Sequence, residues 1–123
     1  MRRSRTLALT AAIAGLVALL AGCSPSAGSV EVGADTVIVD VRTPEEFAQG
    51  HLEGAVNVDL QSGAFEDEIG EYPVDGEYLV YCRIGNRSGQ AVAIMESMGC
   101  DDVHNIGGVE DSSSATGIPI VTD

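Results

Sequence analysis

The chain has 123 residues, of which 19 are acidic and only six are basic, all of them arginine, giving a formal net charge of −13 at pH 7. Nucleic acids and anionic membrane surfaces attract basic proteins, so this balance argues against either as a polar partner. A chain of this length predicts one small domain rather than two.

The first 23 residues have the pattern of a targeting segment. Three arginines lie among the first five residues, an apolar run covers residues 7–21, and small residues lead up to Cys23. The run is too short and too rich in glycine and alanine to predict a membrane-spanning helix. An ordinary secretory signal with an incidental cysteine would explain the same pattern.

Residues 20–23, Leu-Ala-Gly-Cys, resemble the lipobox of bacterial lipoprotein signal peptides, in which the cysteine is acylated. The resemblance implies a signal peptide over residues 1–22, a lipid on Cys23 and a flexible linker to residue 29. We therefore expect a protein held at the cell membrane by lipid alone, facing outside the cytoplasm.

From residue 30 onward, strand and helix patterns alternate. Thr43-Pro44-Glu45-Glu46 is typical of a capped helix start, and Gly50 predicts where that helix ends. Short apolar runs predict the strands, and apolar residues at helical spacing predict the longest helix. Alternation of this kind predicts an α/β sandwich with a mostly parallel sheet and crossover helices. The expected strands are 36–39, 55–58, 78–81 and 102–106, and the other helices are 64–69 and 88–98.

The loop that follows strand 78–81 is the most informative segment. A tight turn at Gly85, followed by a helix, directs backbone N–H groups and a helix N-terminus toward Cys82, which favours a thiolate and a bound anion. Cys82 is therefore the predicted nucleophile. Two of the three arginines after residue 23 also lie in this loop. The predicted anion-binding residues are Arg83, Ile84, Gly85, Asn86, Arg87 and Ser88.

Other conspicuous residues are expected to support this site. Asp40 and Arg42, at a strand end, suggest a charge pair that organises the loops, and His51 is expected to hydrogen-bond within its own turn. No metal site is expected, because His51 and His104 lack an accompanying ligand pattern. Cys82 and Cys100 could alternatively form a structural disulfide in an oxidising compartment.

Three stretches together resemble a single-domain rhodanese, a sulfurtransferase. The resemblance implies a three-layer sandwich over residues 30–123, with a central sheet of about five strands flanked by helices. It further implies a monomer without a cofactor, in which Cys82 takes sulfane sulfur from a thiosulfate-like donor as a persulfide and passes it to a thiol or cyanide-type acceptor. The matching stretches are Asp40–Phe47 with Gly50–Asn57, Cys82–Ser88, and Asn105–Gly108.

The loop length separates two reactions. Cysteine-dependent phosphatases with a similar fold place one residue more between cysteine and arginine than the four found between Cys82 and Arg87. Sulfur transfer is therefore favoured over phosphate hydrolysis. A second hypothesis is a non-catalytic interaction or redox module that oxidises Cys82 and Cys100.

The resemblance is weakest at both ends of the domain. Only residues 30–32 remain of the strand and helix that usually precede the first motif, and no tryptophan follows Gly108. The serine run at residues 112–114 predicts a loop there.

Overall fold

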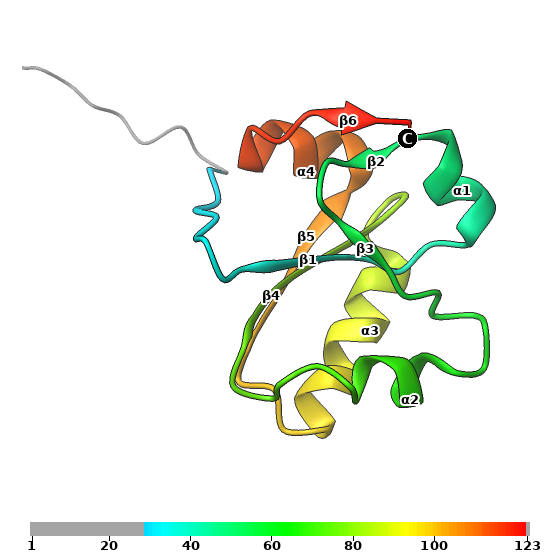
Figure 1. The fold of residues 1–123 in the computed structure, drawn as a ribbon, viewed down its shortest axis with the longest axis vertical. Coiled ribbons are helices and arrows are strands. Elements are labelled where there is room, and N and C mark those ends of the chain that lie inside the picture. Colours follow the sequence, from blue (N-terminus) through cyan, green and yellow to red (C-terminus); the bar gives the residue numbers. More distant parts are fainter. Residues whose placement is uncertain (1–28, 123) are drawn as a thin grey trace, which may run out of the picture.

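The computed structural model describes residues 29–122 (Figure 1). The predicted signal peptide and Cys23 lie outside these residues. Within residues 29–122, no helix is both long enough and apolar enough to cross a membrane.

A parallel sheet of four strands forms the centre of the domain, in the order β3-β1-β4-β5. The α/β class and the parallel sheet are thus confirmed, with four central strands where about five were expected. Two further short strands, β2 and β6, pair with each other in an antiparallel sheet. The strands are β1 (Val37–Asp40), β2 (His51–Leu52), β3 (Val56–Asn57), β4 (Glu77–Cys82), β5 (Asp102–Gly108) and β6 (Ile120–Val121).

Helices and the small sheet cover the two faces of the central sheet. Successive residues of a strand point to opposite faces, so Val80 joins one core and Leu79 the other. Helices α2 and α3 pack on the first face, whereas α4, β2 and β6 lie over the second, which makes three layers (Figure 1). The helices are α1 (Pro44–Gln49), α2 (Phe65–Ile69), α3 (Asn86–Ser97) and α4 (Val109–Thr116).

The serine run was wrongly predicted to be a loop, because it lies inside α4. Serine favours turns and caps over helix interiors, but tertiary contacts override that preference here. Ser112 is fully buried and its hydroxyl donates to the Ile106 carbonyl at 2.9 Å. Gly117, at φ 75°, ends the helix in a left-handed conformation that glycine adopts readily. No strand forms at residues 30–32; instead the Val30 amide donates to the Ala115 carbonyl at 2.8 Å.

Cys82 and Cys100 lie at opposite ends of the domain. Cys82 ends β4, whereas Cys100 precedes Asp102, which pairs with Glu77 at the start of β4. At a rise of about 3.3 Å per residue, the length of β4 separates these ends by about 16 Å, well beyond the Cα separation of about 7 Å that a disulfide tolerates. Both thiols are free, so the structural-disulfide alternative is wrong.

Candidate active site

A buried ion pair organises the sheet edge beside the loop. The Asp40 carboxylate accepts hydrogen bonds from the Arg42 guanidinium, the shortest at 2.7 Å, and from the Arg42 backbone amide at 2.9 Å. Arg42 also donates to the Gly50 carbonyl at 2.6 Å, and the Asn57 side chain donates to the carbonyls of Asp40 and Arg42. The charge pair expected from the sequence is present, and it ties the end of β1 to α1 and β3.

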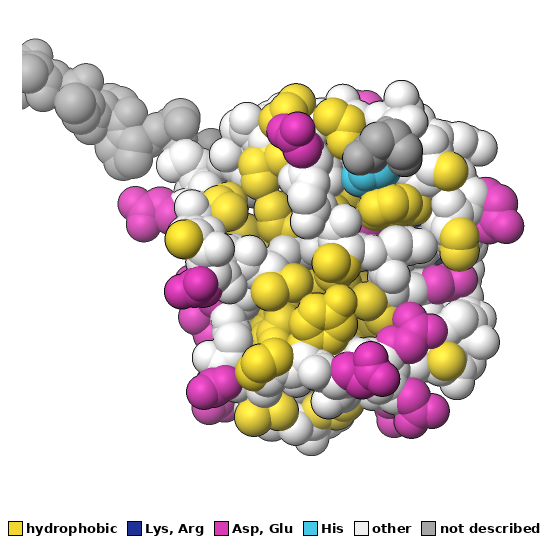
Figure 2. Space-filling model, viewed as in Figure 1, with side chains coloured by type: hydrophobic (Ala, Val, Ile, Leu, Met, Phe, Trp, Pro, Cys, Tyr) yellow, Lys and Arg dark blue, Asp and Glu magenta, His cyan; other side chains and the backbone are white. Residues whose placement is uncertain are grey.

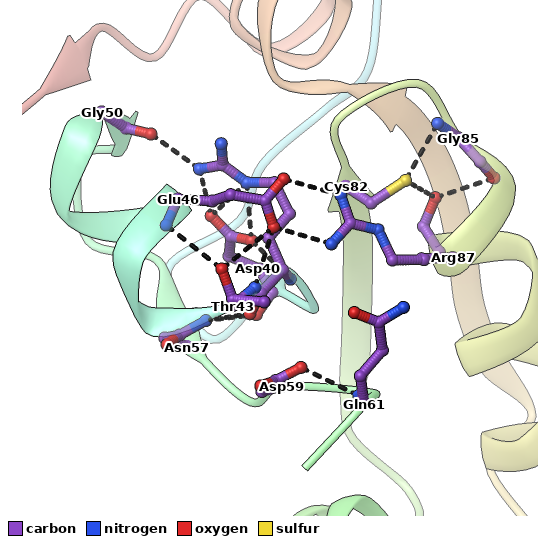
Figure 3. Close-up of polar contacts among 12 residues, drawn as sticks. Asp40, Thr43, Glu46, Gly50, Asn57, Asp59, Gln61, Cys82, Gly85 and Arg87 are labelled. Atoms are coloured by element: carbon purple, nitrogen blue, oxygen red, sulfur yellow. Dashed lines mark hydrogen bonds and ion pairs between the residues drawn. The ribbon is translucent and has the colours of Figure 1, made fainter.

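Cys82 lies fully buried at the floor of the loop between β4 and α3 (Figure 3). Its sulfur accepts a hydrogen bond from the Gly85 amide at 2.9 Å. The Ser88 hydroxyl also donates to the sulfur, at 3.4 Å. Gly85 has φ 98°, a left-handed conformation that allows the chain to fold back over the sulfur. The loop thus directs hydrogen-bond donors at the sulfur, as the sequence suggested.

These contacts set the protonation of the thiol. Burial raises the pKa of Cys82, but hydrogen bonds from the Ser88 hydroxyl and from three backbone amides of the loop outweigh it, so that the net pKa lies below its ordinary value. A lower pKa increases the fraction of thiolate, the nucleophilic form, at neutral pH.

Asn105, on β5, fixes the far side of the loop. Its amide donates to the Gly85 carbonyl at 3.1 Å, and its side-chain oxygen accepts from the Gly107 amide at 3.0 Å. The same oxygen lies 2.7 Å from the Ser88 hydroxyl, so the single hydroxyl proton has competing acceptors in Asn105, Gly85 and the Cys82 sulfur. The sequence showed Asn105 only as part of a motif, with no sign of this contact.

Gly108 lies directly against the loop. A Cβ atom there would be 2.5 Å from the Arg83 carbonyl oxygen, closer than real side chains approach backbone. Glycine at this position therefore allows the two backbones to approach closely. It couples the end of β5 to the start of the active loop.

The two arginines of the loop differ in their surroundings. Arg87 makes two hydrogen bonds to Glu46, at 2.7 and 2.9 Å, so its charge is already paired. Arg83 is exposed and forms no ion pair within residues 29–122. The sequence identified Glu46 as a capping residue, and the capping box with Thr43 is confirmed, but its bond to Arg87 was not foreseen. Ile84 and Asn86 are exposed beside Arg83 at the loop surface.

His51 contacts Phe47, four residues before it in the sequence. Its ring stacks on Phe47 with centroids 3.7 Å apart, and Nδ1 lies 2.8 Å from the Phe47 carbonyl oxygen. The expected local hydrogen bond is therefore present. His104 is exposed and pairs with Asp102 at 2.7 Å. In the part of the chain that the structure describes, no three potential metal ligands gather.

We expect the Ser88→Ala substitution to raise the pKa of Cys82, because it removes a donor to the sulfur. Alkylation of Cys82 by iodoacetamide at pH 7 should slow by about two- to fivefold, and its pH profile should move to higher pH. Ser97→Ala, an exposed serine on the same helix, serves as the control. A profile unchanged in Ser88→Ala would contradict the role of this hydroxyl.

A buried cysteine at a strand end, with hydrogen-bond donors directed at its sulfur, is suited to nucleophilic chemistry by the thiolate. A model of the Rhodanese-like domain family matches residues 29–115. The chain belongs to that family.

Individual relatives agree. Thiosulfate sulfurtransferase PspE of Escherichia coli (strain K12) is 37% identical over 73 residues, which cover 59% of this chain and 70% of that protein. A sulfurtransferase of Allochromatium vinosum is 36% identical over 87 residues, covering 71% and 79% respectively. A solved structure, a rhodanese from E. coli with anions, is 33% identical with a TM-score of 0.60 and covers 72% of this chain and 99% of its own.

Proposed function

We propose that the chain transfers sulfane sulfur through a persulfide on Cys82. Its family and its relatives make it a rhodanese-type transferase. The observation that carries the residue assignment is the buried Cys82 sulfur at the floor of the loop, which accepts a hydrogen bond from the Gly85 amide at 2.9 Å. A small anionic donor such as thiosulfate and a thiol or cyanide-type acceptor are the proposed substrates.

The reaction has two steps, and Cys82 and its loop take part in both: sulfur is first taken from the donor and then passed to the acceptor. The Cys82 thiolate attacks the outer sulfur of thiosulfate, the S–S bond of the donor breaks, and its electron pair leaves with sulfite. The product is a persulfide anion on Cys82, which the Gly85 amide and the loop donors can stabilise as they do the thiolate. An acceptor thiolate or cyanide then takes the outer sulfur and restores the Cys82 thiolate.

Mass spectrometry of the protein after thiosulfate treatment tests the first half-reaction. We expect one added sulfur atom on the peptide that contains Cys82, which a reductant or cyanide removes. Failure to detect that adduct, together with no thiocyanate formation, would favour the non-catalytic alternative.

Arg83 supplies the free positive charge at the mouth of the site. The formal net charge of −13 means that the protein as a whole repels anions, and the face in Figure 2 shows acidic side chains around an apolar area. We expect Arg83→Ala to raise the KM for thiosulfate about three- to tenfold while changing kcat less than twofold, because long-range attraction acts on binding. Gln90→Ala, at an exposed position on α3 outside the loop, is the matched control. Equal KM values in the two variants would rule out this role for Arg83.

We further propose that the domain is a monomer tethered by lipid on Cys23 to the outer side of a cell membrane. The support for the lipid tether is the sequence of residues 1–23 and their resemblance to lipoprotein signal peptides. Metabolic labelling with a palmitate analogue should mark the full chain and not its Cys23→Ser variant. If cells that express the parent chain and cells that express the variant both release unlabelled soluble protein, the leader is instead an ordinary secretory signal.

A further inference from the structure

Glu46 is a charged residue at the site for which the proposed reaction gives no role. It lies in the first turn of α1, and Arg87 lies in the first turn of α3, 41 residues away in sequence. Figure 3 shows the Arg87 guanidinium between Glu46 and the Cys82 side of the loop. The carboxylate therefore reaches across from another element to a side chain of the active loop.

The Glu46 carboxylate accepts four hydrogen bonds. It receives both hydrogen bonds from Arg87, and also bonds from the Thr43 backbone amide at 3.0 Å and the Thr43 hydroxyl at 3.2 Å. The bonds from Arg87, together with those from Thr43, lower the pKa of Glu46 from 4.5 to about 2. Since a lowered pKa keeps the charge until the pH falls toward that value, Glu46 is ionised throughout the neutral range.

This pairing changes the charge that an incoming anion meets. Arg42 is paired with buried Asp40, and Arg87 with Glu46, so Arg83 is the unpaired cation among residues 29–122. The Cys82 thiolate adds a further negative charge at the floor of the loop. The positive charge near the Cys82 sulfur is therefore too small to balance a donor that carries two negative charges.

We propose that Glu46 determines donor specificity by neutralising Arg87, so that the site favours sulfane sulfur donors with a single negative charge over dianions such as thiosulfate. This inference rests on the proposed sulfur transfer and names its preferred substrate class. Organic thiosulfonates have the required chemistry. The Cys82 thiolate attacks their terminal sulfur, the bond between that sulfur and the sulfonyl sulfur breaks, and the electron pair leaves with the sulfinate anion.

Glu46→Gln tests the proposal, because glutamine also completes a capping box but carries no charge. Coulomb energy is proportional to the charge of the ligand. The substitution should therefore change the logarithm of KM twice as much for the dianion as for the monoanion. We expect the KM for thiosulfate to fall about tenfold and the KM for benzenethiosulfonate about threefold, which shifts the preference toward the dianion. Glu45→Gln is the matched control, since Glu45 is the exposed neighbour on the same helix turn and makes no ion pair in the described region.

A second measurement separates this proposal from the reaction itself. In a Cys82→Ser background no sulfur can be transferred, and NMR titration of the Gly85 amide reports binding of the same two anions. Adding Glu46→Gln to this background should strengthen binding of thiosulfate more than binding of benzenethiosulfonate. If the two affinities change equally, or thiosulfate binds more weakly, Glu46 instead orients Arg87 and the proposal is overturned. If the binding shift is seen but the parent protein forms no persulfide, the proposed function fails while the charge effect stands.

Discussion

Cys82→Ala is expected to lower kcat/KM for thiocyanate formation from thiosulfate and cyanide by at least about a thousandfold, because covalent transfer has no route without the nucleophile. The loop should remain folded, since the substitution removes a single atom of side chain from a fully buried position. The assay is the colorimetric detection of thiocyanate, with persulfide formation followed in parallel by mass spectrometry.

Cys100→Ala is the matched control for this experiment. Cys100 is also a buried free thiol, but it lies beyond the opposite end of β4. We expect its activity to stay within about twofold of the parent, with a loss of stability of about 1 kcal/mol from the small cavity. Residual transfer in Cys82→Ala comparable to that of Cys100→Ala would mean that another group carries the sulfur.

Asp40→Ala should be the most destabilising single substitution at the sheet edge, costing about 3–5 kcal/mol in the free energy of unfolding. The change leaves the buried Arg42 guanidinium without its counter-ion and removes the acceptor of the Arg42 amide. Urea unfolding at pH 7, followed by circular dichroism, measures the effect.

Asp102→Ala provides the comparison, because it removes a hydrogen-bonded contact with His104 that is largely exposed to solvent. Exposed pairs contribute little, so its unfolding free energy should change by no more than about 0.5 kcal/mol. Similar losses of unfolding free energy in Asp40→Ala and Asp102→Ala would show that the Asp40–Arg42 pair contributes no more than a surface pair and does not organise the loops. Asp40→Asn keeps the shape of the side chain and one acceptor oxygen. Its loss of unfolding free energy should lie between those of Asp40→Ala and Asp102→Ala.

Much of this architecture could be predicted because its signals are local. The capping box of Thr43 and Glu46 marks the start of α1 in four consecutive residues, and the structure contains both of its hydrogen bonds. Strand β4 and the cysteine at its end were likewise apparent from an apolar run followed by a glycine turn. Each of these features depends on residues that are close together in the sequence.

The features that the sequence did not reveal depend on distant contacts. Helix α4 contains three consecutive serines and is stabilised by burial of Ser112 and by packing of Val109 in the second core, neither of which its composition indicates. The bond between Glu46 and Arg87 joins two helices that approach only once the parallel strands have aligned their carboxyl ends. The polar residues of this edge could be listed from sequence, but their pairing required the fold.

The separation of the two thiols along β4 has a consequence for the lifetime of bound sulfur. In a protein with a second thiol near the nucleophile, a persulfide decays on its own by forming an internal disulfide. Cys100 is too far from Cys82 to do so within this fold. No thiol among residues 29–122 can therefore release the sulfur from a persulfide on Cys82. We expect the sulfur to stay bound until an acceptor molecule reaches the loop, so the rate of release should depend on the concentration of that acceptor.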